Sequence, residues 1–253
     1  MERLNNIFSG KATRNAAGVN TGIQFVLAQY NPAGELMDEP GINRVTVEEV
    51  TEGTPPDKYH RFLSQNNAIW PHEKYLNIWL MSETKYPKFW NSITKLCVPK
   101  YRLGSETLPG LSLPPVPSTW VPKVEQIGIL FRMSTFQYFQ RSIDATAERE
   151  LVTCIGNYLG LLDTWKINNS NVNDQCNDTF AYGIVNNNGS LGTNSSWSKE
   201  VGSYRFLSEN IMDDPTGTHR SVSKDQALRM YWVLKNCAGR SMWQSDFALT
   251  GKE

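Results

Sequence analysis

The stretch ERELVTCIGNYLGLLDTW, Glu148 to Trp165, decides how the whole chain is interpreted. Its apolar residues recur at i, i+4, i+7, i+8 and i+11, which places them on one face of an amphipathic helix. They are Leu151, Ile155, Tyr158, Leu159 and Leu162. Gly160 is a natural helix stop because glycine takes a positive φ without steric penalty. The pattern predicts a packed helix that ends in a turn.

A second set of positions in this stretch has the spacing of a zinc site. In H-E-x-x-H-x-x-G-x-x-H peptidases, two histidines at i and i+4 bind zinc, the glycine permits a turn and a third histidine completes the ligands. The glutamate polarises the metal-bound water. In this chain the five positions hold, in order, Thr153, Cys154, Asn157, Gly160 and Asp163. The spacing is kept, and the residues that perform the chemistry are replaced.

Beyond this spacing, the chain resembles the pappalysin branch of the metzincin metallopeptidases. The zinc helix of that family is typically H-E-x-G-H-x-L-G-L-x-H-T-[WF]. Seven residues of this chain fit it: Gly156, Tyr158, Leu159, Gly160, Leu161, Thr164 and Trp165.

Three further segments extend the resemblance from about Thr21 to Gly251. ENIMDD, Glu209 to Asp214, is similar to the family's Met-turn N-[FI]-M-D-Y. Asn210, Met212 and Asp213 match that motif, and Asp214 departs from it. DQALRM resembles the start of the helix after the turn. IQFVLAQYNPAG and YLNIWL are similar to the N-terminal and central strands.

The resemblance carries over a scaffold, but not zinc chemistry. Threonine and neutral asparagine are poor zinc ligands, and zinc prefers imidazole and thiolate. Cys154 stands at the position of the glutamate and points away from the Thr153–Asn157 pair by roughly 100° per residue of helix. We therefore expect no zinc at Thr153, Asn157 and Asp163, which should form a hydrogen-bonded polar cluster instead. Cys154 should be a buried structural thiol.

The Met-turn and its surroundings are expected to line a cleft next to this helix. The residues assigned to this region are Gly160, Asn210, Met212, Asp213 and His219. Met212 forms the floor beneath the metal in this family and, without metal, should be a packed apolar side chain. His219 is the only histidine near the former cleft, whereas His60 and His72 lack metal-ligand spacing. All three are expected to be surface or hydrogen-bonded histidines.

An Asn- and Ser-rich region, residues 166–202, follows the helix. Its side chains at Asn173, Asp174, Asn177 and Asp178 offer the oxygen ligands that calcium prefers, although without the ordered spacing of a dedicated calcium loop. A calcium site there is a second metal hypothesis. The resemblance also implies a disulfide at Cys176, because pappalysins often bridge this loop.

The expected fold is α+β, a metzincin-like zincin fold within one catalytic-type domain. A twisted mixed sheet with helices should occupy residues 1–160, with strands at 21–31, 41–50, 74–81 and 125–133. The strand at 74–81 is predicted to be central and buried. The loop-rich part, 161–253, should be closed by a helix over 223–236 with Ser223 as its N-cap. The proline-rich segment 101–122 is predicted to be extended.

Composition excludes several function classes. The chain has 25 basic and 25 acidic residues, so no net charge attracts it to nucleic acid. It has no apolar run of about 18 residues that could span a membrane. The start, MERLNNIFSGKATRN, lacks the apolar core of a secretory signal. Members of the resembled family are exported and often anchored outside the cell. A secreted or cell-surface protein, such as a lipoprotein, whose export signal has been removed is therefore expected.

These observations favour a pseudoenzyme over an enzyme. The first hypothesis is an inactive pseudopeptidase that binds a peptide, protein or glycan at the cleft, without a cofactor. The second is an active hydrolase with an unconventional metal site or with Cys154 as its nucleophile. The third is a structural module of a cell-surface assembly. Sequence alone leaves these three open.

Overall fold

The computed structural model describes residues 1–45, 63–81, 95–98, 127–132, 146–167, 173–184, 198–201, 204–214, 217–236, 240 and 242. Its helices are α1 (Glu2–Phe8), α5 (Thr146–Tyr158) and α6 (Lys224–Asn236). Its strands are β1 (Ile78–Met81), β2 (Lys95–Val98), β3 (Gly128–Arg132), β4 (Trp165–Ile167), β5 (Tyr182–Ile184), β6 (Ser198–Val201) and β7 (Tyr204–Leu207).

The largest described sheet has three strands in the order β1-β3-β2. β1 runs parallel to β3, and β2 runs antiparallel to it, so the sheet is mixed, as predicted. Successive residues of β3 alternate between the two faces of the sheet. Ile129, Leu130 and Phe131 are nevertheless all buried, so both faces of β3 are covered.

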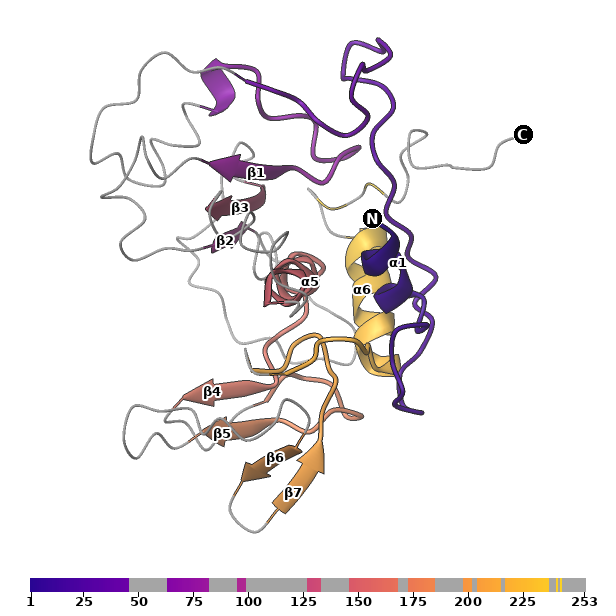
Figure 1. The fold of residues 1–253 in the computed structure, drawn as a ribbon, viewed down its shortest axis with the longest axis vertical. Helices are drawn as coiled ribbons and strands as arrows, with labels where there is room; N and C mark the ends of the chain where they lie inside the picture. Colours follow the sequence, from indigo (N-terminus) through magenta and orange to yellow (C-terminus); the bar gives the residue numbers. More distant parts are fainter. Residues whose placement is uncertain are drawn as a thin grey trace.

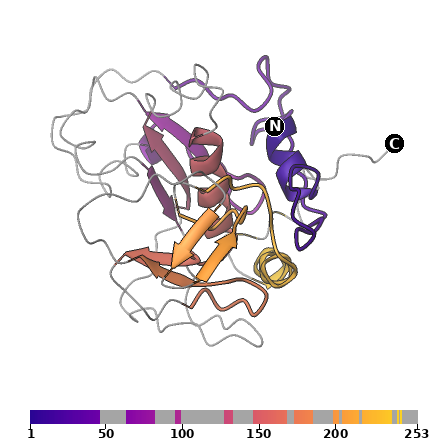
Figure 2. The ribbon, with the colours of Figure 1, turned by 60° about the horizontal axis from the view of Figure 1, so that its bottom comes forward.

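Helix α5 packs against this sheet and links it to the rest of the molecule (Figure 1). The two-stranded pairs β4-β5 and β6-β7 lie on the other side of α5 from the three-stranded sheet. Helices α1 and α6 both lie on the right of the molecule, away from the three-stranded sheet, in the turned view (Figure 2), and Phe8 of α1 and Met230 of α6 belong to one buried cluster. Helix α5 therefore lies at the centre of the described fold.

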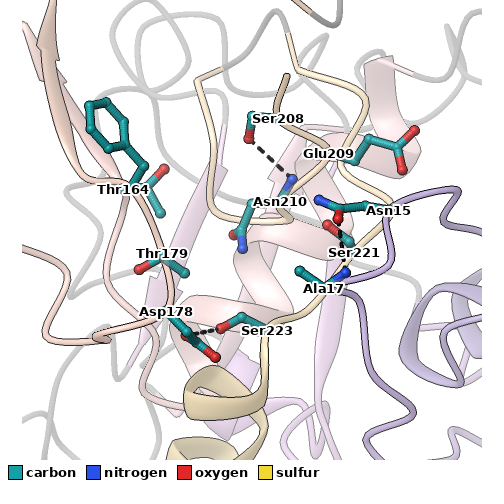
Figure 3. Close-up of a pocket in the computed structure, with 11 residues that line it drawn as sticks. Asn15, Ala17, Thr164, Asp178, Thr179, Ser208, Glu209, Asn210, Ser221 and Ser223 are labelled. Carbon is teal, nitrogen blue, oxygen red and sulfur yellow. Dashed lines mark hydrogen bonds between the residues drawn. The ribbon is translucent and has the colours of Figure 1, made fainter. Parts of the chain in front are cut away.

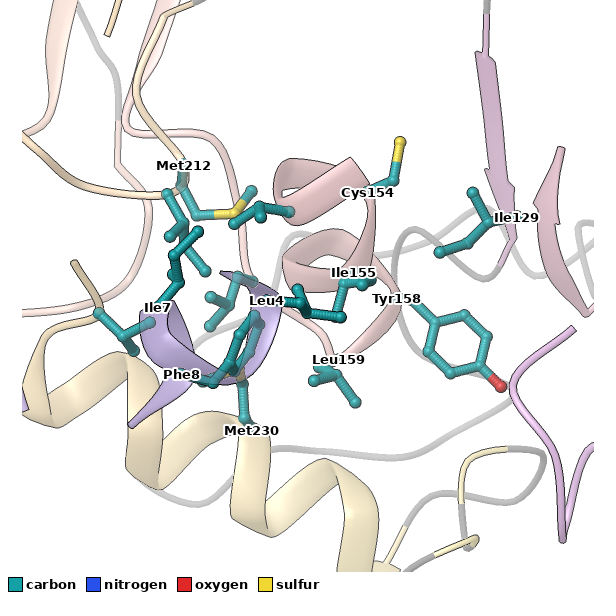
Figure 4. Close-up of a cluster of buried hydrophobic side chains, with 14 of the residues drawn as sticks. Leu4, Ile7, Phe8, Ile129, Cys154, Ile155, Tyr158, Leu159, Met212 and Met230 are labelled. Atoms are coloured by element: carbon teal, nitrogen blue, oxygen red, sulfur yellow. The ribbon is translucent and has the colours of Figure 1, made fainter. Parts of the chain in front are cut away.

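The apolar face of α5 forms the core with α1 and α6 (Figure 4). Ile155 and Tyr158 of α5 and Phe8 of α1 are each 0% exposed. Met230 of α6 and Met212 join them in the same cluster. The periodicity that begins at Leu151 therefore correctly predicts the buried face, because a helix of 3.6 residues per turn aligns those positions.

Helix α5 ends in the turn predicted at Gly160. This residue has φ +89°, and the Leu161 amide donates to the Gly156 carbonyl at 2.9 Å. A Cβ at Gly160 would lie 2.6 Å from Cγ2 of Val233, so the turn also needs the missing side chain for its packing on α6. The Arg229 guanidinium donates to the Gly160 carbonyl and fixes the turn from the same helix.

Helix α6 begins as its sequence predicts. The Gln226 amide donates to the Ser223 hydroxyl at 3.3 Å, and the Gln226 side chain accepts from the Ser223 amide at 3.1 Å. This reciprocal pair is a capping box, which satisfies two otherwise unpaired donors at the start of the helix. The proline-rich segment 101–122 lies outside the described residues.

The strand predicted at residues 21–31 is wrong. The segment has no regular strand and makes only an isolated bridge from Tyr30 to Leu36. Its backbone is paired elsewhere: the Asn5 side chain accepts from the Phe25 amide at 2.8 Å and donates to the Phe25 carbonyl at 2.9 Å. An amide side chain can both donate to and accept from the backbone of an extended segment. It can therefore replace the hydrogen bonds that a neighbouring strand would make.

Two other predictions of strands need correction. Residues 41–45 form no strand, and 46–50 lie outside the described residues. The strand predicted at 74–81 is confirmed as β1, but only from Ile78, and within the described residues it is not central. It pairs with β3 alone, and Ile78 and Leu80 are each 38% exposed. The central strand is β3, within the predicted span 125–133.

Candidate functional site

Thr153 begins the polar face of α5. Its hydroxyl lies 2.8 Å from the Ile211 carbonyl and 3.1 Å from Nδ1 of His219. A carbonyl can only accept, so the single hydroxyl proton is directed to Ile211. Thr153 therefore ties α5 to the Met-turn, at the position of the first histidine of the resembled motif.

Asn157 lies one turn further along the same face. Its Nδ2 donates to the Leu161 carbonyl at 3.2 Å and to Oδ1 of Asp163 at 3.2 Å. Both partners are acceptors, so the amide orientation is fixed by its surroundings. The turn at Gly160 brings Asp163 back to the helix, which matches the geometry that the spacing predicts. Thr153 and Asn157 do not share a hydrogen bond; each has its own partners.

His219 belongs to this group and is 3% exposed. Its Nε2 lies 2.9 Å from the Asp214 carbonyl, and its Nδ1 lies 3.4 Å from the Arg149 carbonyl in addition to the contact with Thr153. Burial lowers the pKa of His219 below its ordinary value of 6.5, and the backbone carbonyls oppose that shift. His219 also has a φ of +50°, a left-handed conformation that is uncommon for non-glycine residues, although histidine adopts it more often than most.

The residues at the three former ligand positions do not fit zinc. The Thr153 hydroxyl is committed to a backbone carbonyl, and the Asn157 amide presents N–H donors, not a lone pair, to its neighbours. Asp163 offers carboxylate oxygens, one of which already accepts from Asn157. Zinc needs deprotonated nitrogen, sulfur or carboxylate ligands in tetrahedral array. Within the part of the chain that is described, no three His, Cys, Asp or Glu side chains are grouped to hold a metal ion.

Cys154 stands at the position of the catalytic glutamate. It is a free thiol, 2% exposed, and belongs to the hydrophobic core cluster. Figure 4 shows its sulfur pointing away from Met212, on a different side of α5. A reactive cysteine needs access and a group that stabilises its thiolate. The surroundings of Cys154 are those of a structural thiol.

The Met-turn is held by paired amides. Asn210 and Gln226 exchange two hydrogen bonds, at 2.8 and 2.9 Å, and the Met212 amide donates to Oδ1 of Asn210 at 2.9 Å. Met212 is fully buried against Gly156, where a Cβ would lie 2.5 Å from its sulfur. Gly156 therefore gives Met212 the space to lie directly on α5.

Two buried carboxylates end this turn. Asp213 and Asp214 are 1% and 2% exposed, and the Tyr182 hydroxyl contacts both, at 2.7 Å for Asp214. Burial and the two carboxylates raise the pKa of Tyr182, which is therefore a neutral donor here. Asp214 is the residue that departs from the resembled motif. Tyr182 was not identified from sequence, because its 31-residue separation from Asp213 carries no local pattern.

The four residues of the calcium hypothesis have hydrogen bonds within the fold. Oδ1 of Asn173 accepts from the Gln175 amide, and the Asn177 amide donates to Asp225. Asp174 is 2% exposed and accepts from the hydroxyl of Thr179. Burial raises the pKa of Asp174.

The carboxylate of Asp178 caps α6. It accepts from the Ser223 hydroxyl at 2.6 Å and from the Asp225 amide at 2.9 Å. A negative charge is stabilised at a helix N-terminus. Cys176 in the same loop is a free thiol, so the disulfide that the resemblance implies is not formed. Burial raises the pKa of its thiol to about 12.

The other histidines take no part in this group. His72 is 8% exposed, and its Nε2 lies 3.4 Å from Oε1 of the neighbouring Glu73. His60 lies outside the described residues.

Comparison with solved structures identifies the fold. Mirolysin in complex with compound 9 superposes with a TM-score of 0.58 at 18% identity, covering 98% of this chain and 87% of that one. Mature mirolysin from Tannerella forsythia with a cleaved peptide gives the same TM-score at 19% identity, covering 98% and 86%. A promirolysin mutant from the same organism matches at 19%, covering 96% and 75%. This chain has a metallopeptidase-like fold. No family model and no curated protein matches the sequence.

Mirolysin and this chain therefore share an overall fold. The mixed sheet with helices is consistent with that metallopeptidase-like α+β fold. No described helix is both long and apolar enough to cross a membrane.

Proposed function

We propose that this chain is a metallopeptidase-fold protein that does not hydrolyse peptides and instead binds an extended peptide segment of another protein. The observation that carries the proposal is the amide of Asn157. It stands where the fold family's second zinc ligand would stand, and it donates to both the Leu161 carbonyl and Asp163. Its Nδ2 is fixed as a donor by two acceptors, and an amide nitrogen has no lone pair available to bind a metal.

The burial of Cys154 argues against the alternative of a cysteine hydrolase. A thiol that is 2% exposed within the apolar core is out of reach of a peptide carbonyl, and burial in apolar surroundings disfavours the thiolate. An unconventional metal site would have to rest on Asp163, the only ionisable group among the three former ligand positions.

Peptide binding is supported by the arrangement of the sheet. Among the described strands, β2 pairs with β3 alone, so no described strand covers its outer edge. Extended peptides add to such edges by main-chain hydrogen bonding. A mirolysin structure with the same overall fold contains a cleaved peptide, which supports the capacity of this architecture to accommodate one. We also propose a secreted or cell-surface location, since the resembled family is exported.

A cleavage assay with matched variants tests the inactive status. The wild type should leave a peptide library intact after incubation with zinc, as measured by mass spectrometry. The variant Thr153→His/Asn157→His/Asp163→His should bind zinc without cleaving peptides. Addition of Cys154→Glu to that variant supplies the general base and should give detectable turnover. Zinc-dependent cleavage by the wild type would contradict the proposal.

Peptide binding is tested separately from cleavage, by retention of the protein on immobilised peptides. The same library, immobilised, should retain wild-type protein on a subset of extended peptides. Backbone N-methylation of a retained peptide at alternate residues should abolish retention, because it removes the donors used in strand addition. Retention that is insensitive to N-methylation would exclude the edge of β2 as the binding element.

A further inference from the structure

A small pocket of mixed polar and apolar lining lies apart from the former zinc positions (Figure 3). It has a volume of about 220 Å³. It forms where the N-terminal segment meets residues 208–210 at the start of the Met-turn and the loop that precedes β5. Thr164 of its lining follows Asp163 directly, but none of Thr153, Asn157 and Asp163 lines it. The pocket is thus not the former metal site.

The pocket wall includes several hydroxyl and amide groups, although more of its surface is apolar than polar. Ser208 and Ser221 contribute hydroxyls from the Met-turn side, and Thr179 contributes one from the opposite wall. The Oδ1 atom of Asn15 accepts from the Ala17 amide at 2.9 Å, which leaves the amide N–H groups of Asn15 as donors. A hydroxyl both donates and accepts, so this wall matches a ligand that carries hydroxyls.

The charges of the pocket disfavour an ionic ligand. Among the described residues that line it there is no Lys, Arg or His, so none of them offers a counter-ion to an anion. Asp178 is held by the Ser223 hydroxyl and the start of α6, which stabilise its charge. The other carboxylate, Glu209, is directed toward Thr13 and the Arg14 amide, at 2.7 and 3.1 Å, and in Figure 3 it points away from the opposite wall. The two carboxylates of the pocket therefore do not require a cationic ligand.

An aromatic ring completes the lining. Phe180 lines the pocket and is 51% exposed, so its ring is accessible to a ligand. It stacks on Tyr182 with a centroid separation of 6.3 Å and an interplanar angle of 18°, which fixes the ring orientation. The C–H groups on one face of a pyranose ring carry partial positive charge, and they pack on the negative face of an aromatic ring.

The volume sets the size of the ligand. Pockets for drug-sized molecules span roughly 300–1,000 Å³. A pocket of about 220 Å³ is smaller and accommodates one ring of that kind. From these features together we propose that this pocket binds a single neutral sugar residue, with its ring on Phe180 and its hydroxyls on Ser208, Ser221, Asn15 and Asp178. This site is independent of the peptide-binding proposal.

Saturation-transfer NMR on the full chain tests this assignment. The probes are the methyl glycosides of glucose, galactose, mannose and N-acetylglucosamine at millimolar concentration, with n-butylammonium and inorganic phosphate as charged comparators. At least one glycoside should show transfer, and neither charged probe should. Absence of transfer to all four glycosides, or preferential binding of a charged probe, would overturn the proposal.

Two substitutions locate the bound glycoside. Phe180→Leu keeps an apolar side chain but removes the aromatic face, and should weaken binding about fivefold. Ser208→Ala removes one hydroxyl and should weaken it about threefold. The matched control is Tyr30→Leu, which removes an aromatic ring of similar exposure, 47%, far from the pocket. A glycoside whose affinity is unchanged by both pocket variants, or lowered equally by the control, binds elsewhere and overturns the assignment.

Discussion

The two faces of α5 have different roles in the fold. One face, including Ile155 and Tyr158, is dry and packs against α1, α6 and the sheet. The other, with Thr153 and Asn157, is polar, and its groups are satisfied by carbonyls, a histidine and a carboxylate. The dry face keeps the helix in place, and the polar face joins it to the Met-turn. The side chains at the ligand positions of the resembled motif are therefore held by hydrogen bonds within the fold.

The dry face should carry most of the stability. Ile155→Ala removes a side chain that is 0% exposed and leaves a cavity, so we expect a loss of about 2–5 kcal/mol in the free energy of unfolding. Leu228→Ala on α6 is the control, since Leu228 is 56% exposed and should cost less than about 0.5 kcal/mol. Urea denaturation measures both. Equal losses would mean that the core lies elsewhere.

The turn at Gly160, at the end of α5, is expected to have the second-largest effect on stability. Gly160→Ala places a side chain at φ +89° and 2.6 Å from Val233, and it should destabilise by about 3 kcal/mol. Gly34→Ala separates the two causes, because Gly34 has φ +83° but no heavy atom within 4 Å of the added Cβ. That control should cost about 1–2 kcal/mol. If the two variants unfold at the same urea concentration, the contact with α6 contributes nothing.

On the polar face, we expect the hydroxyl group of Thr153 to contribute more to stability than the shape of its side chain. Thr153→Val leaves the Ile211 carbonyl and His219 without this partner, at a cost of about 1–3 kcal/mol. Thr218→Val is an isosteric control beside the same histidine: within the described residues, its buried hydroxyl lacks a hydrogen-bond partner. Removal of that hydroxyl should be neutral or stabilising. Thermal denaturation that ranks the two in reverse would refute the bonding of Thr153.

The smallest effect is a pH dependence from His219. Burial lowers its folded-state pKa, so above about pH 6.5 both states are neutral and no proton-linked penalty exists. As the pH falls, the unfolded chain binds a proton that the folded chain resists, and stability is lost by up to about 1.4 kcal/mol per pH unit.

His219→Asn tests this linkage. Asparagine tolerates the positive φ of this position, and it should flatten the dependence of the unfolding free energy on pH between about 7 and 5. Asp213 and Arg149 face the histidine and act in opposite directions on its charge, so their own substitution would confuse the readout. His72→Gln serves as the control, and an equally flattened profile in it would exclude His219 as the source.

The dry face was predictable from sequence, and the polar face was only partly so. Periodicity places Ile155 and Tyr158 in the core, and glycine at a helix end predicts the turn at Gly160. The spacing also places Asp163 beside Asn157. The pairing of Thr153 with His219, 66 residues away, leaves no local signal. It depends on how the Met-turn folds back, which the tertiary structure alone decides.

The strand predicted at 21–31 failed for a related reason. Alternation at Ile23, Phe25 and Leu27 is typical of a strand, and Ile23 and Phe25 do pack on the core. The pattern does not determine what pairs with the backbone, and here the Asn5 side chain pairs with it at Phe25. A side chain from a helix 20 residues earlier substitutes for a neighbouring strand.

Zinc stoichiometry tests the central claim most directly. Wild-type protein and the triple variant Thr153→His/Asn157→His/Asp163→His would be incubated with zinc, dialysed and assayed by inductively coupled plasma mass spectrometry. Hydrogen bonds that replace the ligands predict a negligible zinc content for the wild type and about one zinc per chain for the variant. One zinc per wild-type chain, lost on Asp163→Ala, would contradict the account.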